Sequence, residues 1–276
     1  TSLDNPRIPG GFTYLGQFAD HGITLDLAPL SDKKRDPLGL ENFRTPTLDL
    51  DNLYGLGPDG SPHLYARDPD DPTSRGPKLL NGENINVDFG DVTGDFDNDL
   101  PRSPEGMALI GDARNDENLL VAQTHLAFLK FHNAVVDRLA AAGVAKEDLF
   151  AEARRVVTWH YQFIILFDCV ERLCGEGTVR QILHQGRKFY CFKTKPYMPV
   201  EFAAAAYRLG HSMVRQTYNY NRIFENADFS RLFGFTGLSG QLIGDLAPED
   251  PSAPLPQPVL PSNWIIDWRR FHELDR

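Results

Sequence analysis

The sequence predicts a mainly α protein with minimal β structure, and two observations indicate this. Residues 106–185 contain few helix breakers, and their apolar side chains recur every three or four residues, which is the period of a helix with one buried face. Residues 1–105 are rich in Pro, Gly and Asp, so we expect a loop-rich segment with short helices there. The length of 276 residues allows one large domain or two small ones.

Three helices are expected beyond residue 106. The first runs from Leu119 to Gly143, and its predicted buried face is Leu119, Ala122, Leu126, Leu129, Val136 and Ala140. The second begins near Glu147, with a predicted buried stripe of Ala153, Val156, Val157, His160, Phe163, Ile164 and Phe167. The third opens at Pro199 and runs through Phe202, Ala205, Leu209 and Met213. The Pro-rich residues 246–262 are expected to be irregular.

Composition excludes some partners and leaves others open. The net charge of −10 argues against nucleic acid or an anionic membrane as the main partner. No run approaches the roughly 18 apolar residues of a membrane span, and none is typical of a signal peptide. The three cysteines, Cys169, Cys174 and Cys191, are too few for a disulfide scaffold. We expect three buried thiols, although a bond from either of the first two to Cys191 remains open, as does the redox compartment.

The stretch 14–29 contains the first candidate site. Gln17, Asp20 and His21 place an amide, a carboxylate and an imidazole within five residues. On a helical turn, Gln17 and His21 are neighbours on one face with Asp20 beside them. A neutral imidazole there can take a proton from a small substrate and return it. The alternative is a histidine that only packs against the core.

Two acidic segments are candidate cation sites. In the segment 45–55, Thr45, Thr47, Asp49 and Asp51 alternate as oxygen donors, which suits a hard cation such as Ca²⁺. Asp-x-Asp patterns are also common in turns and helix caps. The second segment contains Asp88, Asp91, Asp95, Asp97 and Asp99, and we interpret it as a solvated loop.

Two further segments place an arginine three residues before a carboxylate or an imidazole. Arg114 and Glu117 are three residues apart at the expected start of the long helix, where a surface salt bridge is the simplest interpretation. Arg208 and His211 have the same spacing near the end of the third helix. A histidine in that position is more often structural than a ligand when taken alone.

In this order, the four segments around His21, Thr45–Gly55, Arg114 and His211 resemble the landmarks of the animal-type haem peroxidases. That superfamily also includes the cyclooxygenases. The resemblance runs from about Asn5 to the end of the chain. It implies a mainly α haem-peroxidase core, with residues 1–276 forming a single catalytic domain that lacks the family's C-terminal portion. It also implies haem b as the cofactor and hydrogen peroxide as a substrate.

The resemblance assigns roles on the distal side of the haem. His21 matches the distal histidine that carries protons, with Gln17 beside it. Arg114 matches the distal arginine, whose permanent charge can stabilise the negative oxygen that develops as peroxide splits. Asp20 and Glu117 match the two carboxylates that can form ester bonds to haem methyl groups.

On the proximal side, His211 matches the iron ligand and Arg208 an arginine that pairs with a haem propionate. The downstream asparagine that supports the proximal histidine in the family has no counterpart in this sequence. The segment 45–55 matches the calcium loop, although Gly22 stands where the family has a further aspartate ligand. His125, His132 and Asn133 match a helix fingerprint and are expected to be buried structural groups.

The function that the resemblance implies is a peroxidase that reduces hydrogen peroxide and oxidises a halide, thiocyanate or small organic donor. One alternative is a fatty-acid dioxygenase of the same superfamily. Those enzymes have a tyrosine three residues before the proximal histidine, whereas this chain has Arg208 there and Tyr207 one residue away. The other alternative is a non-catalytic haem- or calcium-binding interaction protein. The resemblance favours a secreted or extracytoplasmic location, and the oligomeric state stays open.

Overall fold

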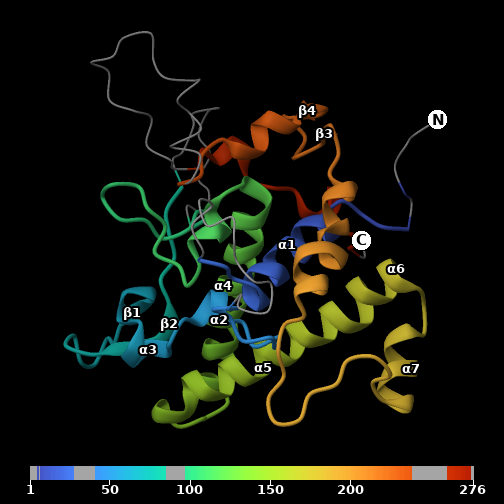
Figure 1. The fold of residues 1–276 in the computed structure, drawn as a ribbon. Coiled ribbons are helices and arrows are strands. Elements are labelled where there is room, and N and C mark those ends of the chain that lie inside the picture. The colour runs from blue at the N-terminus through green and yellow to red at the C-terminus, as the bar shows by residue number, and fades with distance from the viewer. Residues whose placement is uncertain (1–4, 6, 28–40, 85–96, 238–259, 275–276) are drawn as a thin grey trace.

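The longest helix, α4 (Leu119–Ala141), passes through the centre of the molecule in the computed structural model, which describes residues 5, 7–27, 41–84, 97–237 and 260–274 (Figure 1). The Asn118 side chain accepts a hydrogen bond from the Val121 N–H at 3.0 Å and so begins the helix. Residues 119–126 are buried on every side. The predicted helix is confirmed, but Ala140 is exposed because the last turns extend beyond the core.

The helix α1 (Gly11–Ile23) packs against α4 and begins against the C-terminal segment of the described chain. The Gly11 N–H donates to the Phe271 carbonyl at 2.9 Å. A Cβ atom on Gly11 would lie 2.3 Å from Nε2 of His272 and 2.7 Å from that carbonyl oxygen. Only glycine fits this close approach, so residue 11 fixes how α1 enters the core.

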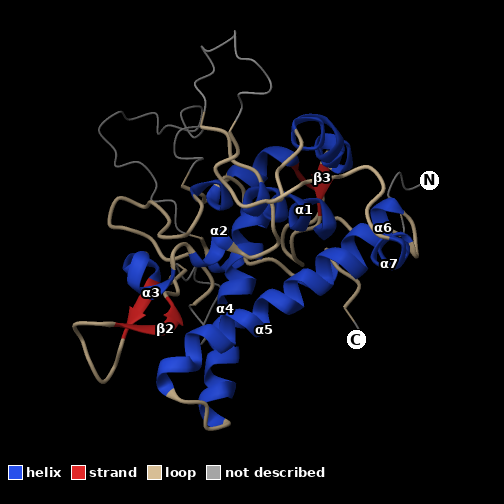
Figure 2. Cartoon of the chain, turned by 60° about the horizontal axis from the view of Figure 1, so that its bottom comes forward, coloured by secondary structure: helices blue, strands red, loops and turns tan. Residues whose placement is uncertain are grey.

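The second long helix, α5 (Leu149–Phe163), runs beside α4 and continues into a π-helical stretch, η5 (Ile164–Val170) (Figure 2). Its buried residues are Leu149, Ala153, Val157, Tyr161, Ile165 and Cys169. The predicted stripe was therefore wrong at His160 and Phe163, which are exposed. The observed residues are spaced by four, because the helix packs along an inclined i, i+4 ridge that continues through the wider π turn.

The third predicted helix, after Pro199, is helical but not α-helical. A π-helical stretch, η6 (Phe202–Ala206), leads into a 3₁₀ helix, η7 (Tyr207–Met213). The predicted apolar face was wrong, since Leu209 is 72% exposed and Phe202 is 39% exposed. The side that faces α1 includes Tyr207, whose hydroxyl donates to the Gly16 carbonyl at 2.8 Å.

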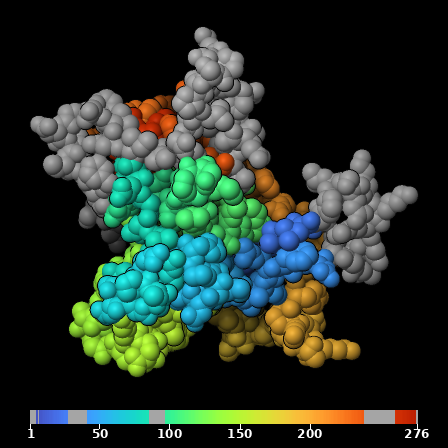
Figure 3. All heavy atoms as spheres, turned by 90° about the vertical axis from the view of Figure 1, so that its left-hand side faces the viewer, coloured from blue at the N-terminus to red at the C-terminus, as the bar shows by residue number. Residues whose placement is uncertain are grey.

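In the described residues, the β strands form two small antiparallel pairs, and isolated bridges join Gly82 to Asp99 and Arg102 to Ala108. β1 (Tyr65–Arg67) pairs with β2 (Arg75–Leu79), and β3 (Thr217–Tyr218) pairs with β4 (Ala227–Asp228). The first pair belongs to residues 41–84. Figure 3 shows the surface of this segment in blue to cyan, with green residues above it and yellow-green residues below it. The remaining short helices are α2 (Asp51–Tyr54), α3 (Gly57–Gly60), η2 (Pro62–Leu64), η3 (Ala113–Asp116), η4 (Lys146–Asp148), α6 (Glu171–Cys174), α7 (Thr178–Gln185), η8 (Phe229–Phe233), η10 (Ser262–Trp264) and η11 (Trp268–Arg270).

The main core lies between α1, α4 and α5, and an aromatic cluster around Tyr220, Trp264 and Phe271 packs beside it. All three thiols are free. Cys169 is buried as expected, but Cys174 and Cys191 are exposed, because residues 171–199 contribute no side chain to either core. Of the helices that the structure describes, none combines the length and apolar character needed to cross a bilayer. Most of the Pro-rich segment 246–262 lies outside the described residues.

Candidate active site

The imidazole of His21 lies at the C-terminal end of α1, where it meets the η3 turn. Its Nδ1 is 2.8 Å from Oδ1 of Asn115, and its Nε2 is 4.0 Å from Oε1 of Glu117. His21 is 5% exposed. Burial and the nearby Arg114 charge lower the His21 pKa, although the hydrogen bond to Asn115 opposes this. The ring is therefore neutral at pH 7, with one nitrogen held and the other directed toward a carboxyl group.

Arg114 is held in the η3 turn by Asp112, which caps that turn. The Arg114 Nε and Nη2 donate to the Asp112 carboxylate at 3.0 and 2.8 Å, and Nη2 also reaches the carbonyls of His21 and Thr24. Burial would raise the Asp112 pKa, but Arg114 and Arg44 together lower it. Asp112 thus takes the guanidinium in place of Glu117, so the surface salt bridge that the spacing left open as an alternative is not the pairing observed.

Gln17 and Glu117 are in direct contact. The Gln17 amide donates to Oε1 of Glu117, and Nδ2 of Asn118 donates to Oε1 of Gln17 at 3.0 Å. Burial raises the Glu117 pKa, whereas the charges of Arg114 and His211 lower it. The Glu117 side chain is 33% exposed, so it stays reachable. The predicted pair Gln17 and His21 thus share a face of α1 and both approach Glu117.

Asp20 bridges α1 and η7. Its Oδ2 accepts from Nη1 of Arg208 at 2.8 Å, and its Oδ1 accepts from the Thr24 hydroxyl at 2.9 Å. The Asp20 side chain is 6% exposed and the Arg208 side chain 44% exposed. This ion pair joins two residues to which the family resemblance assigns separate partners, a haem methyl group and a haem propionate.

His211 lies one 3₁₀ turn beyond Arg208. Because a 3₁₀ helix has three residues per turn, the two side chains project from the same side. Nδ1 of His211 is 3.1 Å from the Arg208 carbonyl oxygen. The imidazole is exposed, and the helix η7 that carries it packs against α1, which carries His21.

In the acidic loop before α2, hydroxyl and carboxylate oxygens are joined by hydrogen bonds. The Thr45 and Thr47 hydroxyls donate to Oδ2 of Asp49 at 2.7 and 2.6 Å, and Thr45 also reaches Asp51 at 3.0 Å. Burial and the Asp49 charge raise the Asp51 pKa. Beside this loop, Oδ1 of the buried Asn52 makes no hydrogen bond within the described chain.

Among the described residues, no three His, Cys, Asp or Glu side chains are gathered so as to hold a metal ion. Asp88, Asp91 and Asp95 of the second acidic segment lie outside the described residues. Asp99 departs from the solvated-loop expectation, because it is 2% exposed and pairs with Arg102 at 3.0 Å.

Sequence reasoning missed three residues that shape the site. Asp112 anchors Arg114, Asn115 holds His21, and Arg102 joins Asp99 to Asp116 on the η3 turn. A signal existed only for Asp112, since an aspartate two residues before an arginine suits a turn cap. His125 and His132 are fully buried, as expected for structural groups.

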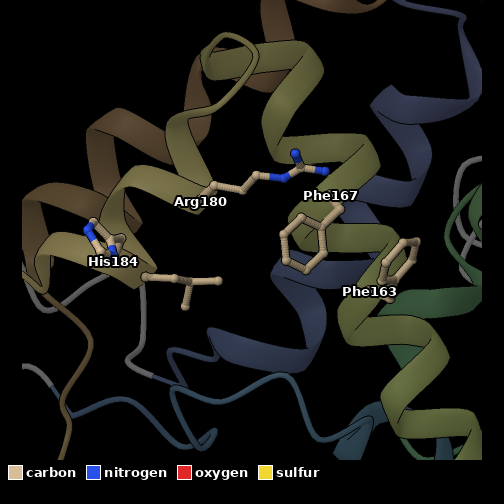
Figure 4. A pocket seen from close by; sticks show the side chains of 5 residues that line it. Phe163, Phe167, Arg180 and His184 are labelled. Carbon is tan, nitrogen blue, oxygen red and sulfur yellow. The ribbon is translucent and has the colours of Figure 1, made fainter.

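A separate groove of about 690 Å³ lies between η5 and α7. Phe163, Phe167 and Leu183 supply apolar walls, and Figure 4 shows Arg180 extending from α7 toward Phe167 with His184 on the α7 side. None of the predicted site residues lines this groove.

The residues of the site fit a haem in the chemistry of their donor set. Nδ1 of His211 is occupied by a carbonyl, which leaves Nε2 as the ring nitrogen for a metal. His21 offers a neutral imidazole, Arg208 a half-exposed guanidinium, and Glu117 a reachable carboxyl group. The Asp20–Arg208 ion pair must rearrange if Asp20 is to bond to a haem and Arg208 to a propionate.

The comparisons with known proteins identify the family. The family model for animal haem peroxidase matches residues 28–233, a range that includes Arg114 and His211 but begins after His21. Heme peroxidase 2 of Caenorhabditis elegans is 24% identical over 230 residues, which is 74% of this chain and 31% of that protein. Thyroid peroxidase of Canis lupus familiaris is 33% identical over 109 residues, which is 38% of this chain and 11% of that protein.

Solved structures share the fold at low sequence identity. The fatty acid alpha-dioxygenase of Arabidopsis thaliana superposes with a TM-score of 0.59 and 18% identity, covering 89% of this chain and 46% of that one. Peroxidase A from Dictyostelium discoideum gives a TM-score of 0.55 and 16% identity, covering 84% and 53%. The chain thus spans about a third of the length of Heme peroxidase 2 and about half of these two structures. The mainly α prediction is confirmed.

Proposed function

We propose that this chain, which belongs to the animal haem peroxidase family, binds haem b and reduces hydrogen peroxide while oxidising a halide, thiocyanate or small organic donor. The observation that carries the proposal is the neutral His21 imidazole, whose Nδ1 is held by Asn115 and whose Nε2 lies 4.0 Å from Glu117, on a helix that packs against the helix of His211. Haem, when bound, supplies the redox centre at which two electrons reach the peroxide.

His21 has the properties of a proton carrier. Its Nε2 takes a proton from one peroxide oxygen and returns it to the other, so that water leaves from the second oxygen. Burial supports this role by keeping the ring neutral at pH 7. Gln17 orients the adjoining Glu117 carboxyl and so helps to shape the space beside Nε2.

Arg114 stabilises the negative charge that develops on the departing oxygen. Its Nε and Nη2 are committed to Asp112 and to carbonyls of α1, whereas Nη1 makes no hydrogen bond within the described residues. We assign Nη1 the catalytic contact. The Asp112 carboxylate fixes the guanidinium plane and hence the direction of that contact.

His211 is the proposed iron ligand and the Arg208 guanidinium the proposed propionate partner. The Arg208 carbonyl accepts from Nδ1 of His211, and this bond orients the ring and raises its basicity. Asp20 and Glu117 are the proposed ester sites, and Glu117 is the more accessible of the two.

We also propose that the loop before α2 binds a calcium ion. Thr45, Thr47, Asp49 and Asp51 are its proposed ligands, and their oxygens already converge. A divalent cation would relieve the repulsion between the two carboxylates. The buried Asn52 supplies an unpaired amide oxygen next to Gly22, where the resemblance predicts the missing ligand.

Two alternative functions differ from a peroxidase in the role of Tyr207 or in whether bound haem turns over peroxide. A fatty-acid dioxygenase of the cyclooxygenase type needs a tyrosine facing its substrate, but Tyr207 donates its hydroxyl to the Gly16 carbonyl and burial raises its pKa. A non-catalytic interaction protein would bind haem or calcium without peroxide turnover. A secreted or extracytoplasmic location stays a prediction.

The two histidine roles are separable by substitution. His21→Ala is expected to keep haem and lose turnover of hydrogen peroxide with a phenolic donor by about 10²–10⁴-fold. His211→Ala is expected to lose haem. His184→Ala, in the separate groove, is the control that should leave both unchanged. Full turnover in His21→Ala would refute the proposed proton carrier.

A further inference from the structure

A buried chain of three side chains extends from His21 into the core. Oδ1 of Asn115 lies 2.8 Å from Nδ1 of His21, and Nδ2 of Asn115 lies 3.0 Å from Nδ1 of His125. Their exposed fractions are 5% for His21, 0% for Asn115 and 1% for His125. They come from α1, η3 and α4, so three separate elements meet at one amide, which we call the amide bridge.

The two ends of an amide are chemically different, and this gives the amide bridge a direction. The carbonyl oxygen only accepts hydrogen bonds, so Nδ1 of His21 must carry its proton and leave Nε2 bare. The amide nitrogen only donates, so Nδ1 of His125 must be bare and its proton must lie on Nε2. The orientation of one side chain therefore sets the tautomer of both histidines.

His125 is suited to hold that orientation. Complete burial lowers its pKa to about 3, so the ring stays neutral and keeps an acceptor at Nδ1. The Phe18 ring meets the His125 ring edge-on at 5.9 Å between centroids, which restricts its rotation. Asn115 itself is one residue from Arg114 and two from Glu117, so the same turn carries the other polar groups of the site.

We propose that Asn115, oriented by His125, is a positioning residue that keeps His21 in the Nδ1–H tautomer, with Nε2 bare toward Glu117. This inference rests on the proposed function, because a bare Nε2 is what proton abstraction from peroxide requires. With the opposite tautomer, Nε2 would carry a proton and could not act as a base. Asn115 and His125 act through His21 and touch no substrate.

The direct test is the tautomer of each histidine. The chain as purified, with ¹⁵N-labelled histidine and no added haem, is examined by long-range ¹H–¹⁵N correlation spectra at pH 7. We expect the Nδ1–H form at His21 and the Nε2–H form at His125. An Nε2–H form at His21 in the wild-type chain would overturn the proposal, whether or not the chain turns over peroxide.

Substitutions at the amide separate positioning from packing. Asn115→Leu removes both hydrogen bonds at similar volume, and we expect His21 to lose its single tautomer. Asn115→Asp keeps an acceptor for Nδ1 of His21, so in this variant we expect the Nδ1–H form, as in the wild-type chain. His132→Phe is the control, since His132 is buried on α4 but bonds only Tyr54 and the Pro77 carbonyl in the described chain. A pure Nδ1–H form in Asn115→Leu would overturn the proposal.

Turnover gives a second readout. We expect Asn115→Leu to lower kcat for peroxide at least tenfold with the donor KM unchanged, and Asn115→Asp to restore most of it. Equal losses in the two variants would show a packing effect and overturn the positioning role. If the tautomers behave as expected but the wild-type chain has no turnover, the proposed function fails while the amide bridge stands.

Discussion

Replacing Arg102 by methionine tests the charge network beneath the η3 turn. The Arg102 side chain is 7% exposed and lies between Asp99 and Asp116, whose side chains are each 3% exposed. Nε and Nη2 reach Asp99 at 3.1 and 3.0 Å, and Nη1 and Nη2 reach Asp116 at 2.6 and 3.0 Å. Arg102→Met keeps much of the side-chain volume but leaves two buried carboxylates without their cation.

The expected cost follows from that geometry. Breaking a buried ion pair by removing one partner costs about 3–5 kcal/mol, because the remaining charge is uncompensated. At roughly 2–3 °C per kcal/mol for a chain of this size, the melting temperature should fall by about 10 °C. Urea denaturation and thermal melting followed by circular dichroism measure both quantities. Since Asp116 ends the turn that carries Arg114 and Asn115, we also expect peroxide turnover to fall.

The pH dependence of the deficit identifies its cause. Burial raises the Asp116 pKa even with Arg102 present, and removing the cation raises it further. When folding raises the pKa of a carboxyl group, the free energy of unfolding falls as pH rises through that range. The stability lost in Arg102→Met should therefore be largest at pH 7 and shrink toward about pH 4. Arg155→Met breaks an exposed ion pair with Glu152 and should cost less than about 1 kcal/mol. Equal costs for the two variants would refute the reasoning.

Three further predictions concern packing, thiols and calcium. Gly11→Ala should lower the free energy of unfolding by about 1–3 kcal/mol in urea titrations, because its Cβ has no room, and an unchanged value would contradict the close approach. A maleimide should label Cys174 and Cys191 rapidly and leave Cys169, whose pKa burial raises to about 12, unlabelled until the chain unfolds, as mass spectrometry will show. Added calcium should raise the melting temperature of the wild-type chain and not of Asp51→Asn, and an equal rise in both would argue against the loop site.

Much of the architecture could be predicted because it depends on local signals. The helical period from Leu119 and the cap at Asn118 determine α4, and breakers mark the loop-rich segment before it. The buried stripe of α5 could not be predicted in full. Its residues follow the angle at which α5 crosses α4, and that angle is a tertiary property. The 3₁₀ geometry at His211 depends in the same way on packing against α1.

The candidate site shows the same division. Motif order singled out His21, Arg114 and His211, and in the structure α1 contacts both η3 and η7, which carry the other two. It did not predict which partner each would take. Arg114 pairs with Asp112, two residues away, whose turn-capping signal was missed. Arg208 pairs with Asp20, 188 residues away, and such a partner depends on distance and burial, which spacing along the chain does not contain. The role of Asn115 could not be predicted from the sequence, because its two partners, His21 and His125, lie 94 and 10 residues away.

The absorption spectrum of the purified protein with added haem tests the central claim most directly, before and after acid–organic extraction of the pigment. We predict a Soret band for the wild-type chain and none for His211→Ala at the same protein concentration. Pigment that stays with the protein after extraction would support ester bonds through Asp20 and Glu117, and pigment that extracts freely would remove those bonds while leaving the peroxidase. The absence of a Soret band in the wild-type chain would contradict the proposal that it is a haem peroxidase.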